Sequence, residues 1–228
     1  MDHDMSVYLT STPTINFDDR TVMEYASAVS GTSADPVEQA VNLFYAVRDD
    51  IRYDPYSVDL SPEGLSASAT LKKGRGWCVA KAILLAACCR AVKIPARLGF
   101  ADVRNHLSTE RLLKSLKTDV FFWHGYTSIY LSGNWIKATP AFNIALCERF
   151  GIKPLNFDGE NDAIIHPYDL QGKKHMEYLN YRGEFPDVPI NEIMETFFRE
   201  YPGALSWSKS DFEEEREQDM KKRRKAKG

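Results

Sequence analysis

The stretch GRGWCVAKAILLAACCRAVKIPAR, residues 74–97, decides how the rest of the chain is interpreted. From Cys78 to about Val92 almost every residue is apolar, and only one lysine and one arginine interrupt the run. A helix that is hydrophobic all round is usually a buried central helix. Cys78 then falls in the first turn of this helix, where unpaired N–H groups and the positive end of the helix dipole favour a thiolate.

The position of Cys78 separates it from the other cysteines. Cys88 and Cys89 lie in the middle of the predicted helix among alanines and are expected to be small buried hydrophobes. Cys147 gives no comparable signal. Gly74 and Gly76 precede Cys78 and would let the backbone approach a substrate closely, with the Cys78 amide acting as an oxyanion donor.

A thiol nucleophile needs a base that is close in space but distant in sequence. His124 is the best placed of the five histidines, since it lies in VFFWHGYTSIYL, residues 120–131, a run rich in aromatic and β-branched residues that predicts a strand. The turn Ser-Gly-Asn and the segment WIKATPAF complete a hairpin. The alternative is a half-buried sheet histidine bonded to backbone. His106 is a weaker candidate because it lies in a loop before a short helix at about 108–118.

The remaining elements are less distinctive. Asp35-Pro36 starts an amphipathic helix over 36–51, and a helix is predicted at 191–202. Residues 154–189 are interpreted as loop-rich with a few short elements, and we expect them to border the active-site cleft. Trp77 would wall the site or pack at its rim.

Composition excludes several classes of function. The chain has 228 residues with 43% hydrophobic content, a net charge of -3 and a pI near 6.0, so nucleic acid is not expected as a partner. No run approaches the ~20 apolar residues that span a bilayer, so no membrane partner is expected. The N-terminal residues lack the order of a signal peptide, and four cysteines without paired spacing fit the cytoplasm, where thiols stay reduced.

No metal or cofactor is expected. The histidines and cysteines have no spacing typical of a zinc site. Asp158, Glu160 and Asp162 alternate as in a calcium loop, but they lack the glycine and terminal glutamate of an EF-hand. A turn with solvated acids is the better interpretation, and a metal-dependent hydrolase has little support.

Two motifs together resemble the transglutaminase-like superfamily. Residues 74–97 are similar to its cysteine motif, G-x-C-x-x-x-A followed by a leucine-rich helix that ends in R-x-x-G-I-P-A-R. HGYTSIYLSGNWIKATP, residues 124–140, is similar to its second motif, in which a histidine opens a strand and W-x-x-x-D-P follows a turn. The order and spacing of the motifs also match, and the resemblance spans about residues 36–145.

The resemblance implies an α+β papain-like fold, in which the helix carrying the cysteine packs on an antiparallel sheet carrying the histidine. Carried over by position, Cys78 is the nucleophile and His124 is the general base and later the acid. The implied chemistry is acyl transfer from an amide of a protein or peptide substrate, such as a glutamine side chain or a peptide bond, to water or to a small amine acceptor.

One departure from the family pattern affects the third catalytic position. Thr139 stands where the family has the aspartate that orients the histidine, and threonine carries no charge. Asn143 is the alternative, because an amide oxygen orients the histidine in papain-like proteases. A competing hypothesis is therefore a binding or scaffold module on the same fold that has lost turnover.

The sequence suggests four regions. Residues 1–35 form an N-terminal segment, 36–145 the transglutaminase-like core, 146–208 a loop-rich C-terminal extension packed on the core, and 209–228 a charged, solvated tail with an acidic block before a basic one. The acyl donor, the acceptor and the oligomeric state are not specified by the sequence.

Overall fold

The computed structural model describes residues 4–106, 108–165, 168–201 and 221–222, and it has the predicted α+β class. Most of the charged tail at 209–228 lies outside the described residues. The helices are η1 (Met5–Leu9), α1 (Arg20–Val29), α2 (Pro36–Asp50), α3 (Pro62–Leu65), α4 (Ala67–Lys73), α5 (Cys78–Ala91), α6 (Glu110–Leu116), α7 (Ile144–Phe150) and α8 (Ile190–Glu200). The strands are β1 (Arg52–Tyr53), β2 (Arg75–Gly76), β3 (Ala96–Asn105), β4 (Val120–Leu131), β5 (Asn134–Ala138) and β6 (Met176–Phe185).

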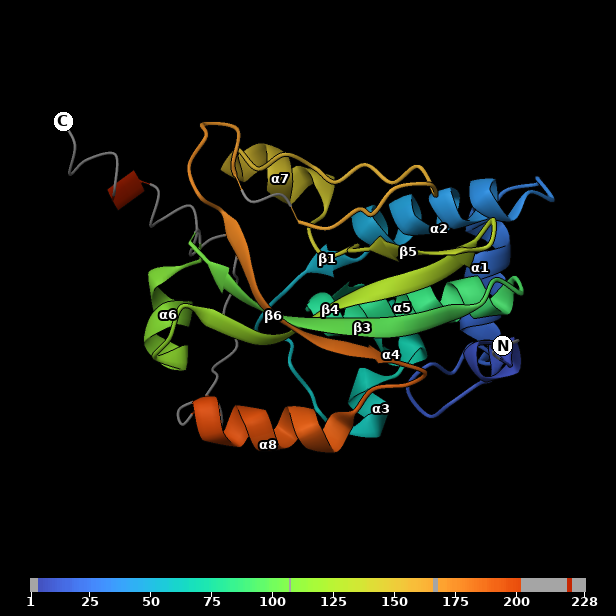
Figure 1. The fold of residues 1–228 in the computed structure, drawn as a ribbon, viewed down its shortest axis with the longest axis horizontal. Coiled ribbons are helices and arrows are strands. Elements are labelled where there is room, and N and C mark those ends of the chain that lie inside the picture. Colours follow the sequence, from blue (N-terminus) through green and yellow to red (C-terminus); the bar gives the residue numbers. More distant parts are fainter. Residues whose placement is uncertain (1–3, 107, 166–167, 202–220, 223–228) are drawn as a thin grey trace.

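The central sheet is antiparallel, with the strand order β5-β4-β3-β6. Figure 1 shows it in the middle of the molecule, with α5 packed behind β3 and β4. β4 and β5 form the predicted hairpin, in which Leu131 faces Asn134 and Thr127 faces Ala138. A second, two-stranded parallel sheet joins β1 to β2, directly before α5.

Helix α5 is the buried centre that its composition predicts. All of its residues from Cys78 to Arg90 are buried, and α1, α2 and α4 pack against it on the side away from the sheet. Its two charged side chains are satisfied by backbone carbonyls: Lys81 Nζ donates to Arg48 O and Ile51 O at 2.9 and 2.5 Å, and Arg90 donates to Ala96 O. Buried cations without such partners would be very costly.

The starts of two helices agree closely with those predicted from the sequence. Asp35 caps α2 by accepting a hydrogen bond from Val37 N, and Pro36 occupies the first helical position. The short helix α6 is capped one residue later than expected, by Thr109 instead of Ser108, because the Thr109 hydroxyl accepts from Leu112 N.

Two segments differ from the sequence-based expectation. Residues 67–73, for which no helix was predicted, form α4, which Ser66 caps through a hydrogen bond from Ala69 N. Residues 154–189, interpreted as mostly loop, contain the ten-residue strand β6. β6 was missed because it is an edge strand whose polar residues and irregular pairing with β3 hide the alternation of a regular strand.

Candidate active site

Cys78 is the first residue of α5, after Trp77 as N-cap residue and the short strand β2. No side chain caps this helix, so its first N–H groups are left for another partner. The backbone N–H groups of Gly125, Val79 and Cys78 itself act to lower the pKa of the thiol. The sulfur therefore lies near amide donors at the start of a buried helix.

Strand β4 reaches this helix end because residue 125 is a glycine. A Cβ added to Gly125 would lie 2.9 Å from the Cα of Val79, closer than real Cβ contacts allow. Two residues further along, the Thr127 hydroxyl donates to Ala82 O of α5 at 2.9 Å, which fixes the strand to the helix. The glycine that follows His124 is therefore what lets the histidine strand close on Cys78.

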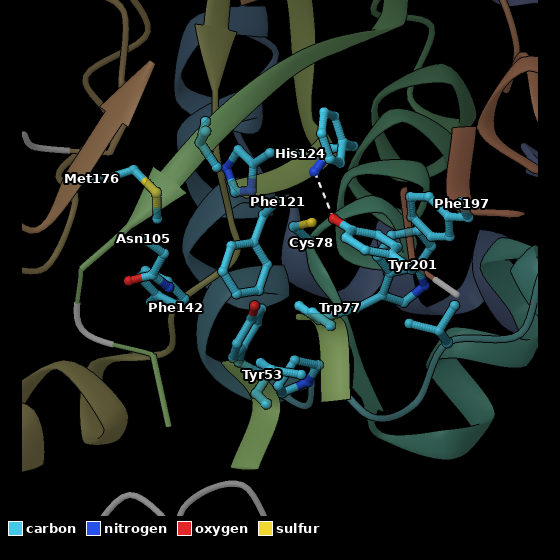
Figure 2. Close-up of a pocket in the computed structure, with 16 residues that line it drawn as sticks. Tyr53, Trp77, Cys78, Asn105, Phe121, His124, Phe142, Met176, Phe197 and Tyr201 are labelled. Carbon is cyan, nitrogen blue, oxygen red and sulfur yellow. Dashed lines mark hydrogen bonds between the residues drawn. The ribbon is translucent and has the colours of Figure 1, made fainter. Parts of the chain in front are cut away.

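Cys78 and His124 line the same cavity, which has a volume of about 50 Å³. Half of its other lining residues are aromatic, and the lining includes residues of β1, β3, β4, β6, α6 and α8. Figure 2 shows the sulfur of Cys78 among these side chains, with His124 on one side and Phe197 and Tyr201 on the other. A cavity of this size has room for a few waters.

Helix α8 closes the cavity. Phe197 packs against Trp77 with ring centroids 6.1 Å apart, and Tyr201 packs against Phe197 at 4.9 Å. The Tyr201 hydroxyl accepts a hydrogen bond from Phe122 N at 2.7 Å and donates one to Val120 O at 3.2 Å, so it is bound to the main chain of β4. These contacts place two aromatic side chains beside Cys78, where they narrow the access to its sulfur.

Burial dominates the electrostatics of the closed site. It raises the pKa of Cys78 to about 11, an effect that the surrounding amide N–H groups only partly offset. It also lowers the pKa of His124 to about 4, and nearby His175 acts in the same direction. The expectation that the helix start makes Cys78 a thiolate is wrong for this closed state, because desolvation outweighs the helix dipole. The pair is a neutral thiol and a neutral imidazole.

Thr139 lies close to the histidine strand, in line with the position of the family's aspartate. Thr127 faces Ala138 across the β4–β5 hairpin, so Thr139 comes opposite the residue two beyond His124 and on the same sheet face. His124 Nε2 and Thr139 Oγ1 are both buried, and neither has a hydrogen-bond partner among the residues that the structure describes. Thr139 also lies beside Tyr178, whose ring meets that of His124 edge-on at 6.4 Å.

The other sequence candidates lie at different places. Asn143 precedes α7, and its amide oxygen accepts a hydrogen bond from Tyr53 N at 3.1 Å, which ties α7 to β1. Trp77 lines the cavity, as one of the two interpretations expected. His106 is not among the residues that line it, and its Nε2 lies 3.5 Å from Glu177.

Sequence reasoning missed most of the residues that close the site. Phe197 and Tyr201 were recognised only as part of a C-terminal helix, and nothing in the sequence indicated that they reach Cys78. His175 is buried, stacks on Phe142 at 5.8 Å and lies within electrostatic range of His124, although its segment was interpreted as loop. Met176, from the segment expected to border the cleft, does line the cavity.

Two carboxylates of the acidic turn accept hydrogen bonds from backbone N–H groups. Asp158 accepts from Glu160 N and Asn161 N at 2.9 and 2.8 Å, and Asp162 accepts from Lys137 N. Within the described ranges, no group of three or more histidine, cysteine or acidic residues is arranged to hold a metal ion. No helix in these ranges is long and apolar enough to cross a membrane.

Comparison with known families settles the relationship that the motifs indicated. The sequence model described as "Transglutaminase-like superfamily" matches residues 23–140, which is just over half of the chain and includes Cys78, His124 and Thr139. The chain belongs to the transglutaminase-like superfamily. The match begins inside α1, which packs on α5, so it extends further toward the N-terminus than the 36–145 region recognised from the sequence.

Solved structures and curated proteins add less. The structure of "a Putative Cysteine Protease from Cytophaga hutchinsonii" is similar at 19% identity and a TM-score of 0.48, covering 81% of this chain and 55% of that one. A "putative protease" from Parabacteroides distasonis is similar at 15% identity and a TM-score of 0.38, covering 56% of this chain and 26% of that one. The chain thus spans about half of the first and a quarter of the second. No curated protein matches.

Proposed function

We propose that this protein is a thiol-dependent acyltransferase or amide hydrolase that acts on a protein or peptide amide. The observation that carries the proposal is that Cys78, whose thiol lies near amide donors at the start of α5, lines the same cavity as His124. Family membership supports the general chemistry. Cytoplasmic localisation belongs to this proposal, because a reducing compartment keeps a nucleophilic thiol free.

The reaction follows from the neutral pair. When substrate enters, His124 accepts the thiol proton as the Cys78 sulfur attacks the amide carbonyl carbon. His124 then gives this proton to the departing nitrogen, the C–N bond breaks and a thioester remains. Water or a second amine attacks the thioester, and the sulfur leaves as the thiol. The amide N–H groups around Cys78 are suitable donors for the negatively charged oxygen of each tetrahedral intermediate.

Thr139 is the group that we expect to orient His124. A hydroxyl can accept one hydrogen bond from the imidazole but cannot stabilise its charged form as a carboxylate would. We therefore expect a slow enzyme. Asn143 remains the alternative, although its amide oxygen already accepts a hydrogen bond from Tyr53 N.

A binding or scaffold role is the second candidate. It is favoured by the uncharged residue at position 139 and by the closure of the cavity by α8. Such a protein would keep the cavity but would not form a thioester.

Covalent labelling separates the two. The protein is incubated with a chloroacetyl or vinyl analogue of glutamine, or with a peptide aldehyde, and the labelled residue is identified by mass spectrometry. An enzyme is expected to be labelled at Cys78, with Cys78→Ala unlabelled and His124→Gln strongly slowed. Cys147→Ser, which removes a thiol outside the cavity lining, is the control. Labelling that is unaffected by His124→Gln would contradict the proposed mechanism.

A further inference from the structure

The central sheet is irregular at one place, directly beside His124. Between the pairs Ala101–His124 and Val103–Phe121, β3 contributes one residue and β4 contributes two. The extra residue makes a β-bulge, which bends the strand and changes the direction of the side chains that follow it. Trp123, the residue before the histidine, is part of this bulge.

The other neighbour of β3 is irregular at the same level. Between the pairs Phe100–Gly183 and Ala101–Tyr181, β6 contains one extra residue, Arg182, and a second extra residue, Leu179, follows between the pairs Asp102–Asn180 and Val103–Tyr178. Both strands that flank β3 are therefore bulged where β3 passes the candidate site.

The side chain of Asp102 connects the bulge of β4 at Trp123 to the bulge of β6 at Arg182. The residue is only 5% exposed, and its Oδ1 accepts hydrogen bonds from Trp123 N at 3.2 Å and from Arg182 Nε at 2.6 Å. Asn180 Nδ2 donates to the other carboxylate oxygen at 3.4 Å. The buried carboxylate of Asp102 thus binds the main-chain N–H of Trp123 in β4 and the side chain of Arg182 in β6.

Trp123 needs such support. Its φ is +60°, in the left-handed region that is unfavourable for a residue with a Cβ. The ring is held by the Arg182 guanidinium, 4.6 Å from the ring centroid, and by packing on Phe100 and Phe185. A strained backbone conformation is therefore maintained one residue before His124.

We propose that Asp102 is a positioning residue for His124, acting through the bulge at Trp123. The proposal rests on the proposed function, since it assigns a purpose to the direction of the His124 ring. Without the carboxylate, Trp123 N–H would lose its acceptor and the strain at its φ could relax by rotation of the following peptide. This rotation would carry the imidazole away from Cys78.

The variants distinguish positioning from simple stabilisation. Asp102→Ala removes the acceptor for Trp123 N–H, whereas Asp102→Asn keeps an oxygen there and loses only the charge that faces Arg182. Glu184→Gln is the matched control, because Glu184 pairs with Arg97 across the same two strands, β3 and β6, but not at a bulge. All are made in the full chain and checked for folding by circular dichroism.

The first readout is NMR titration of the His124 imidazole, which requires no activity. Asp102→Ala is expected to move its titration midpoint upward by at least about half a unit, toward the ordinary value, because the ring leaves its buried place. Asp102→Asn should restore most of the wild-type behaviour, and Glu184→Gln should leave it unchanged. A folded Asp102→Ala protein with an unchanged His124 titration overturns the proposal. If Asp102→Ala does not fold, Arg182→Gln is used, with a smaller upward shift expected and no shift overturning it.

The second readout is a double-mutant cycle on the rate of Cys78 alkylation by iodoacetamide. Asp102→Ala is expected to slow alkylation by about tenfold or more when His124 is present, since small displacements of a base are costly. In a His124→Gln background it should have no further effect. Equal slowing in both backgrounds would show a structural role only. If His124→Gln itself has no effect on alkylation, the proposed function fails, while the NMR result still decides whether Asp102 positions the ring.

Discussion

The two ends of helix α5 carry cysteines that composition alone does not distinguish, and the structure gives them different surroundings. At the N-terminal end, Cys78 is 8% exposed, lines a cavity and lies near amide N–H groups of α5 and β4 that act to lower its pKa. Toward the C-terminal end, Cys88 and Cys89 are fully buried, and burial is the main cause that raises the pKa of each thiol. Burial is therefore common to all three thiols, and what separates Cys78 is a space beside the sulfur and donors that face it.

The largest effect expected from this difference concerns chemical labelling. Cys78→Ala should abolish labelling of the folded protein by iodoacetamide, read by mass spectrometry of intact protein and peptides. Cys88→Ala should leave labelling at Cys78 unchanged and cost about 1 kcal/mol of stability through lost packing. Faster labelling of Cys88 or Cys147 than of Cys78 would break the comparison.

The buried His124 of β4, which lines the cavity at the N-terminal end of α5, predicts a pH dependence of folding stability. Burial lowers the pKa of His124 from 6.5 to about 4, so below pH 6.5 the unfolded chain takes up a proton that the folded protein does not. Stability should be fully present above pH 6.5 and fall as the pH drops toward 4, by up to about 3 kcal/mol. Urea unfolding at several pH values measures this, and His124→Gln should make the dependence shallower. If the free energy of unfolding depends on pH equally in both proteins, a group other than His124 is responsible.

Access to the cavity can be tested on α8. Phe197→Ala should raise the rate of Cys78 alkylation by about tenfold, because it removes a ring that packs on Trp77 and lines the cavity. Phe198→Ala is the matched control, since its ring is on the same helix but 63% exposed. If both variants react like the wild type, α8 does not control access, and the distinction between the two ends of α5 rests on the donors alone.

The smallest expected effect concerns Thr139. Thr139→Asp should raise the alkylation rate by about fivefold, because a carboxylate favours the charged imidazole, and Thr139→Ala should lower it by a similar factor. Asn143→Ala is measured in parallel. A loss with Asn143→Ala and none with Thr139→Ala would assign the third position to Asn143.

The parts of the fold that were predictable are those in which local sequence and tertiary structure agree. α5 and the β4–β5 hairpin follow from a continuous apolar run and a turn between β-branched segments, and their bounds match within a few residues. β6 was not predictable, because a strand with extra residues loses the alternation that identifies strands.

The candidate site was predictable only where a motif carried it. Cys78 and His124 line one cavity, but Phe197 and Tyr201 reach it, and His175 comes near His124, through contacts between segments far apart in the chain. The role of Asp102 depends on strand register, which no local pattern specifies. The low pKa of His124 depends on how completely the site is closed, and this also is a property of packing.

The position of β6 in the sheet has a consequence for folding. β3, β4 and β5 follow one another in the chain and can pair through short connections, whereas β6 joins β3 only after the long excursion from Ala138 to Met176. We expect the three-stranded unit with α5 to form first and β6 with α8 to dock later. Amide hydrogen exchange should then be slow in α5 and β4 and faster in β6. Because Arg182 and the aromatic side chains of α8 arrive with this last step, the polypeptide would complete its core before it completes its reactive centre.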